Sequence, residues 1–349
     1  MTKRLIYLQS GFWEKIRKCD SVEDKRLFWD LYGALECSNI KTDISLGEWA
    51  EDKDDLLYYL LQSSYDGNGT RIGFCATENI HDASDFTKEQ PIENLCAVFL
   101  LDEETKACQE RSKEFGVLCL NSDIIKEHRF VRGDAVMYEK GETYDKFDKC
   151  KRQLSSPCNS IILIDPYVLS SKRGVELNLI PLLDRCMPQE PENQDDQKID
   201  FHLAILSQTN GCKEKYKEDL RYEEIYGFVL AEIRKIRPKL RMKFSLYHTN
   251  TTGNGDGDFH SRHLLTNCML VNSEDGFNFF ENKRDQNTKK WETVSGKHAR
   301  LEFLYPTLID NRRLDADNYY RWIKLSANNS IDNPLCWGDK ENRLFELVD

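Results

Sequence analysis

Residues 95–101, Leu-Cys-Ala-Val-Phe-Leu-Leu, form an unbroken apolar run in the first half of this 349-residue chain. A continuous run of this length is typical of a strand that is buried on both faces of a sheet. A helical pattern follows over Glu103–Phe115, and Gly116 separates it from a second apolar run, Val117–Leu120. Strand, helix and strand at this spacing predict a βαβ unit and therefore a parallel sheet.

The rest of the chain predicts a second α/β domain. A polar stretch over about residues 130–157 places a domain boundary near residue 150, so we expect domains over 1–150 and 151–349. The second domain opens with Ile161–Ile164, which Asp165-Pro166-Tyr167 terminates. Further elements are expected as a helix over 175–186, a strand over 201–206, a helix over 217–236, a strand over 240–248 and a strand pair over 259–266 and 269–272. In the first domain we expect a strand over 3–9 and a helix over 11–37.

Composition bounds the functional classes. The net charge of -11 argues against a protein that coats nucleic acid non-specifically, because such binding relies on neutralising phosphates. One run, Arg234–Lys243, holds six basic residues in ten, and a solvated helix end or a phosphate-facing surface would explain it equally well. The 12 cysteines include no C-x-x-C pair, which favours reduced thiols in a cytoplasmic protein. No apolar run reaches the roughly 20 residues that a membrane-spanning helix needs, so we expect no transmembrane segment.

His260 and Arg262 are the candidate phosphate-contacting residues of the second domain. Side chains two apart on a strand share a face, so these two would project together. An imidazole can attack or protonate a phosphate while a guanidinium holds its oxygens. Asp165, at the end of the first strand of this domain, could orient the imidazole. An arginine paired with a neighbouring carboxylate is the competing structural explanation.

The order of these segments resembles the phospholipase D-like fold. Within it, the chain is most similar to the domain that follows microtubule-interacting-and-transport modules, and to bacterial relatives of that domain. The resemblance covers about residues 158–282 and rests on Ile164-Asp165-Pro166-Tyr167, Asn178-Leu179, the strand at 201–206, Phe259-His260-Ser261-Arg262, Asn267 and Gly276-Phe277-Asn278-Phe279-Phe280.

This resemblance implies a phosphodiester site that needs no cofactor. His260 matches the nucleophile of the catalytic family members. Arg262 stands where they have a lysine and Asn267 where they have an aspartate, and no glycine-serine pair follows. Catalytic members use two histidines, so the single copy here implies a homodimer. The non-catalytic relatives bind phospholipid head groups and also dimerise.

The first domain is similar to PIN-like nucleases over about residues 3–130. Asp102 and Asp123 follow its two clearest strands, and the carboxyl ends of parallel strands are where open α/β sheets bind ligands. With Glu36, Asp43 or Glu48 as another acid, these carboxylates predict a site for Mg²⁺ or Mn²⁺. The sequence departs from the family at Gln9-Ser10, where such nucleases have an aspartate. Acids in these positions also cap the following helices, which is the alternative explanation.

Two functional hypotheses follow. The first is a component of a bacterial defence or conflict system that binds or cleaves nucleic acid, as a phosphodiesterase or nuclease if it is catalytic. The second is a non-catalytic scaffold or binding protein, which holds a partner protein or a phospholipid head group in the same pocket.

Overall fold

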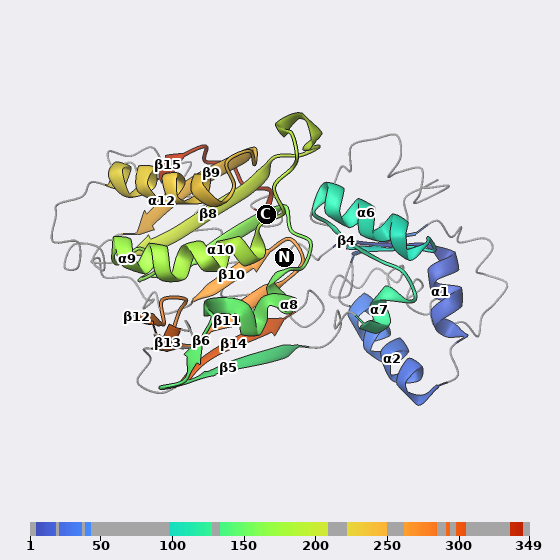
Figure 1. The fold of residues 1–349 in the computed structure, drawn as a ribbon. Coiled ribbons are helices and arrows are strands. Elements are labelled where there is room, and N and C mark those ends of the chain that lie inside the picture. Colours follow the sequence, from blue (N-terminus) through green and yellow to red (C-terminus); the bar gives the residue numbers. More distant parts are fainter. Residues whose placement is uncertain are drawn as a thin grey trace. The chain divides into compact units, whose positions relative to one another are not determined.

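A computed structural model describes residues 5–18, 21–36, 39–42, 98–127, 133–208, 222–249, 262–284, 291–293, 298–304 and 336–344. The chain divides into two compact units (Figure 1). The first unit runs to Gly133, and the second begins at Asp134 and continues through Phe303, with strand Cys336–Gly338 added to it. The division therefore falls before the expected boundary near residue 150. The mixed α/β class expected from the sequence is confirmed for the described elements.

The first unit contains the expected parallel sheet. Its strand order is β2-β1-β3-β4, and all three pairings are parallel. The strands are β1 (Leu5–Leu8), β2 (Asn39–Thr42), β3 (Val98–Leu100) and β4 (Leu118–Leu120). The helices are α1 (Ser10–Arg17), α2 (Val22–Glu36), α6 (Thr105–Phe115) and α7 (Ile124–Glu127). The single helix expected over 11–37 is thus two helices, α1 and α2.

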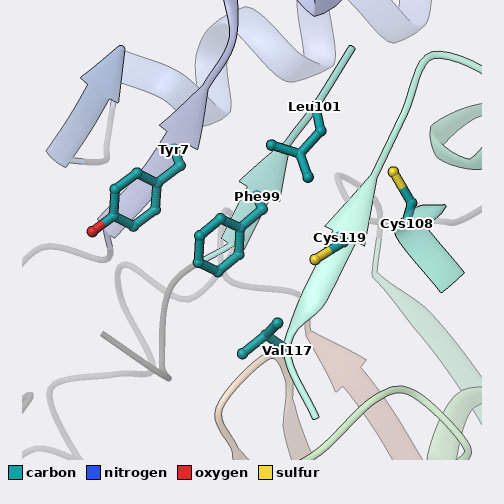
Figure 2. Packing of buried hydrophobic residues seen from close by; sticks show 6 residues of the cluster. All are labelled: Tyr7, Phe99, Leu101, Cys108, Val117 and Cys119. Atoms are coloured by element: carbon teal, nitrogen blue, oxygen red, sulfur yellow. The ribbon is translucent and has the colours of Figure 1, made fainter. Parts of the chain in front are cut away.

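A row of side chains across three strands forms the core of the first unit (Figure 2). Tyr7 pairs in register with Phe99, and Phe99 pairs with Cys119, so the three side chains share one face of the sheet. The rings of Tyr7 and Phe99 stack with centroids 4.8 Å apart. Cys108 of α6 closes this cluster. All residues of β3 and β4 are buried, as expected of parallel strands that are covered on both faces.

The parallel half of the second unit is built by two crossover helices. Strands β7 (Ser160–Ile164), β8 (Phe201–Gln208) and β9 (Met242–Thr249) pair in parallel and in that order. The connection from β7 to β8 carries α9 (Lys172–Gly174) and α10 (Ile180–Cys186), and the connection from β8 to β9 carries α12 (Tyr222–Ile236). Right-handed crossovers in the same direction place these helices on one face, where Figure 1 draws α10 and α12 in front of the sheet.

The antiparallel half brings distant segments to β7. Strand β10 (His263–Thr266) runs antiparallel to β7, so its first residue, His263, lies beside Ile164. Outward from β10 follow β11 (Leu270–Ser273), β14 (His298–Leu304) and β5 (Asp134–Glu139), and β15 (Cys336–Gly338) completes the opposite edge beside β9. A small sheet contains β6 (Thr143–Tyr144), β12 (Phe280–Arg284) and β13 (Trp291–Thr293). A 3₁₀ turn, Lys146–Cys150, leads into α8 (Lys151–Leu154).

A π-helical turn, Val175–Leu179, joins α9 to α10. Pro181 follows at the start of α10, and it has no backbone N–H to donate to the residue one turn before it. The wider turn accommodates this missing bond and the bulk of the proline ring, as π-bulges do inside helices. Asn178 lies in the turn and is 1% exposed, so the irregularity presents an amide side chain to the protein interior.

The described helices and cysteines bear on two expectations from composition. No helix among the described residues is long and apolar enough to cross a membrane. The seven described cysteines are buried free thiols, in agreement with the expectation of reduced cysteines. Burial raises the pKa of Cys108 to about 11 and that of Cys119 to about 12, which keeps both as unreactive thiols near neutral pH.

Candidate functional site

Asp165 anchors the carboxyl end of β7 from inside the protein. Its side chain is fully buried, and its two oxygens each accept a backbone N–H: Tyr167 donates to Oδ1 and Phe277 to Oδ2, both at 2.7 Å. Burial raises the pKa of this carboxyl group, and the two amides and nearby Arg262 oppose that shift. Asp165 therefore joins the β7 loop to the loop that follows β11.

Arg262 lies directly before β10, beside the carboxyl end of β7. Its Nη1 donates to the backbone oxygen of Glu274, and its guanidinium carbon lies 5.6 Å from the ring centroid of Tyr167. Its Nε is buried and has no hydrogen-bond partner. Among the residues that the structure describes, no carboxylate forms an ion pair with Arg262. The charge of Asp165 nevertheless acts on Arg262 from nearby, so the predicted structural alternative, an arginine that neighbours a carboxylate, is met in part.

Gly276 permits the close approach of Asp165 and Arg262. It has a φ of +84°, which favours glycine. A Cβ built on it would lie 2.8 Å from Asp165 Oδ2 and 3.0 Å from Arg262 Cδ. The carboxylate and the arginine side chain therefore pack against the same bare backbone, and any side chain at position 276 would separate them.

Asn178 and Asn278 tie the same loops to the helix that follows β7. Asn178 Oδ1 accepts the Phe280 N–H at 2.7 Å, and Asn178 Nδ2 donates to Asn278 Oδ1 at 2.9 Å. Asn278 Nδ2 donates in turn to Ser170 Oγ at 3.2 Å and to the backbone oxygen of Tyr167 at 3.4 Å. The motif segments at 164–167, 178–179 and 276–280 are thus connected through side-chain amides and a carboxylate.

The other two predicted residues of this site have different outcomes. His260 lies outside the described residues, so its shared face with Arg262 stays a prediction. Asn267 is described and fully buried at the far end of β10, where its Oδ1 accepts the Asn159 N–H at 2.9 Å. Since β10 is antiparallel to β7, Asn267 lies at the amino end of β7 and Arg262 at the carboxyl end. The structure therefore brings Arg262 and Asp165 together at the carboxyl end of β7 and places Asn267 at the opposite end of that strand.

The basic run at 234–243 is occupied by local partners. Arg237 pairs with Asp184 at 2.8 Å, and Arg241 pairs with Asp200 at 3.1 Å. Lys239 Nζ donates to the backbone oxygen of Glu192 at 2.6 Å. The remaining members also have partners: Arg234 with the Leu240 oxygen, Lys235 with Glu232 and Lys243 with Glu341. Of the two explanations left open, the structure favours the structural one, because the run folds against neighbouring acidic segments.

In the first unit, the switch point between β1 and β3 carries Gln9, Lys15 and Asp102. The chain leaves β1 and β3 toward opposite sides of the sheet there, and the carboxyl ends of the strands at such a point are where open α/β sheets bind ligands. Gln9 Oε1 accepts the Asp102 N–H at 2.5 Å. The Asp102 carboxylate pairs with the ammonium group of Lys15, which raises the pKa of that lysine through their hydrogen bond. An amide and a lysine therefore surround the acid at this position.

Only part of the predicted metal site lies within the described side chains. Asp123 is exposed after β4, and near enough for its charge to act on Lys15, while Asn121 Oδ1 caps α7 by accepting the Ile124 N–H at 2.8 Å. Glu36 ends α2, and its side chain lies outside the described part of the structure. Within the described residues, no group of three or more histidine, cysteine or acidic side chains could hold a metal ion. Metal dependence therefore stays a prediction.

Gly11 is expected to be intolerant of any side chain. A Cβ on Gly11 would lie 2.7 Å from Asp102 Cγ and 2.9 Å from Asp102 Cβ. We expect Gly11→Ala to lower the free energy of unfolding by about 1–3 kcal/mol, the usual cost of overpacking. Asp102→Gly removes every atom of this overlap, so urea titrations of both single variants and the double variant should give a coupling that favours the double variant. Strictly additive losses would show that the two residues do not touch.

Sequence reasoning did not assign roles to several residues that build these sites. Tyr167, Gly276 and Asn278 were recognised only as parts of motifs, and Lys15 was not assigned a role. The positive φ of Gly276 depends on a loop conformation that a glycine alone does not specify. Lys15 meets Asp102 because α1 begins directly after β1, a register that an apolar pattern cannot define.

The comparisons with known proteins leave these sites without a family assignment. A scan against protein-family models found no model that matches the chain. A search of curated proteins found no significant match either.

Proposed function

We propose that this chain binds nucleic acid and that its second unit holds the phosphodiester backbone through Arg262 at the carboxyl edge of β7. The observation that carries this proposal is the state of the guanidinium group. It makes a hydrogen bond to a backbone oxygen, and among the described residues no carboxylate neutralises it by an ion pair. A planar guanidinium with free donors suits a phosphate oxygen pair. By contrast, four of the six basic residues at 234–243 are ion-paired with carboxylates.

The proposal is for binding rather than cleavage. Both oxygens of Asp165 already accept backbone amides, so this carboxylate acts as a structural anchor of the loop. Asn267 supports the amino end of β7 at the opposite edge. Of the four residues predicted for catalysis, only His260 remains a candidate to react with a phosphate beside Arg262. This supports a site that binds its ligand without cleaving it.

The proposal includes the finer fold assignments. A phospholipase D-like fold for the second unit is supported by the hydrogen bonds that join its motif segments at 164–167, 178–179 and 276–280. A PIN-like fold for the first unit is supported by its parallel sheet, with Asp102 and Asp123 after β3 and β4. These resemblances extend the proposed role to a cytoplasmic component of a bacterial defence system, working as a homodimer, and light scattering of the purified protein tests the dimer.

Fluorescence anisotropy with labelled DNA and RNA tests the proposed binding. Charge-assisted hydrogen bonds contribute about 1.5–3 kcal/mol, so Arg262→Gln should weaken binding by roughly 10-fold or more. Arg26→Gln is the matched control, because Arg26 is an exposed arginine on α2 and its loss changes the net charge equally. We expect this control to bind as the unchanged protein does. Equal affinities for Arg262→Gln and the unchanged protein would overturn the proposal, as would an absence of binding to every nucleic acid.

The same samples, incubated with and without Mg²⁺ or Mn²⁺ and resolved on gels, distinguish binding from cleavage. We expect intact nucleic acid in all of them. Cleavage without metal that His260→Ala abolishes would indicate phospholipase D-like catalysis instead. Cleavage only with metal would indicate the acids of the first unit. Binding to anionic liposomes in a flotation assay, with no binding to nucleic acid, would support the phospholipid alternative.

A further inference from the structure

We infer that the ligand of this edge is single-stranded nucleic acid, with one base stacked on the ring of Tyr167 and the adjoining phosphate held by Arg262. This inference rests on the proposed function and adds the form of the nucleic acid to it. It comes from the exposure of Tyr167, from the way its backbone is held and from its distance to Arg262.

Tyr167 is an exposed aromatic residue on a strongly held loop. It is 41% exposed and is one of three large apolar side chains exposed among the described residues, with Val22 and Trp29. Its N–H donates to Asp165, and its backbone oxygen accepts from Ser170 N at 2.9 Å and Asn278 Nδ2 at 3.4 Å. The loop therefore fixes the backbone from which this ring projects before any ligand arrives, which lowers the entropy lost on binding.

The two side chains form one recognition unit. The Arg262 guanidinium carbon lies over the Tyr167 ring, 5.6 Å from the ring centroid, so a base would stack on the face turned away from the guanidinium while the arginine holds the adjoining phosphate. An aromatic ring beside a cation is the combination that single-strand-binding proteins use, because every base has a stacking face and every nucleotide has a phosphate. Bases in a duplex are already stacked on their neighbours, so a duplex offers Arg262 its phosphates and offers Tyr167 nothing.

Three probes separate the contributions of the two side chains. The first is oligothymidine of about 16 nucleotides, the upper end of the range for one such binding module. The second is an abasic oligonucleotide of the same length, which keeps the phosphates and lacks the bases. The third is a duplex of that length. Each is titrated against the unchanged protein and the variants Tyr167→Ala, Tyr167→Phe and Arg262→Gln, with Trp29→Ala as the control for loss of an exposed aromatic residue.

We expect Tyr167→Ala to weaken oligothymidine binding by about 5- to 150-fold, the effect of losing one stacked base. Tyr167→Phe and Trp29→Ala should retain that binding. The abasic strand should bind Tyr167→Ala as well as it binds the unchanged protein, whereas Arg262→Gln should weaken its binding. The duplex should bind less tightly than oligothymidine and should not respond to Tyr167→Ala.

Two results would overturn the inference and leave the proposed function intact. One is oligothymidine binding that is unaffected by Tyr167→Ala, with Arg262→Gln still weakening the abasic strand. The other is an equal loss for the abasic strand and oligothymidine in Tyr167→Ala, which would mean that Tyr167 only positions Arg262. If Arg262→Gln changes no titration, the proposed function fails together with the inference.

Discussion

Replacing Asp165 with alanine is expected to lower the free energy of unfolding of the second unit by roughly 2–6 kcal/mol. The change leaves the part-buried amide of Tyr167 and the buried amide of Phe277 without acceptors, and each unpaired amide costs about 1–3 kcal/mol. Since small domains have a net stability of about 5–15 kcal/mol, much of the stability of the unit would be lost. Urea denaturation followed by circular dichroism measures the change. Asp145→Ala is the control, because Asp145 is exposed and its side chain caps nothing.

The pH dependence of the stability that Asp165 contributes follows from its raised pKa. A carboxyl group whose pKa is higher in the folded state than in the unfolded state stabilises the fold most at low pH. This contribution is fully present below the ordinary pKa of 3.8 and declines as the pH rises through the raised value. We therefore expect the stability difference between the unchanged protein and Asp165→Asn to shrink as the pH is raised above the pKa of this carboxyl group in the unfolded state. A difference that grows with pH would contradict burial as the dominant influence.

Gly338→Ala is expected to detach β15 from the edge of the larger sheet. Gly338 has a φ of +97°, and an added Cβ would lie 2.8 Å from Tyr226 Cε2 and overlap the Phe244 backbone oxygen. Tyr226 is itself stacked on Phe244, with ring centroids 4.9 Å apart, so it has little freedom to move. Strain at a positive φ costs about 1–3 kcal/mol, and overpacking costs about 1–3 kcal/mol more.

Hydrogen exchange measured by mass spectrometry tests this effect at the edge itself. We expect faster exchange over residues 336–338 and over the β9 residues opposite them. Gly141→Ala separates the two causes, because Gly141 has a φ of +78° and open space around it, so that variant carries the strain alone. Equal stabilities for the two variants would show that the overlap at Gly338 is relieved without cost.

Strands β3, β4 and β7 could be predicted from sequence because each is a short, unbroken apolar run. β3 and β4 are buried at every position, and so is β7, which makes the signal independent of which face points inward. The strand β5 was not predicted. Its alternating pattern holds only two buried residues, Val136 and Tyr138, and its partner β14 lies far away in the sequence. A strand whose pairing depends on a distant segment has little local signal.

The candidate sites were predictable in position and less so in role. Asp165 was placed correctly at the end of β7, but its full burial depends on the Phe277 amide, which comes from a distant loop. Asn267 was matched to a motif by spacing. However, β10 is only four residues long and ends before that residue, so Asn267 lies at the opposite end of the strand from Arg262. Sequence order specifies which residues neighbour each other along a strand, whereas the pairing of strands decides at which end of the neighbouring strand each residue lies.

The salt dependence of binding tests the central claim that Arg262 contacts a phosphate. For single strands, each phosphate contact contributes about -0.7 to the slope of log K against log salt concentration. Titrations of oligothymidine over a range of salt concentrations should give a slope that is shallower by about 0.7 for Arg262→Gln than for Arg26→Gln. Parallel lines for the two variants would contradict the claim, because they would mean that Arg262 releases no counterion and contacts no phosphate.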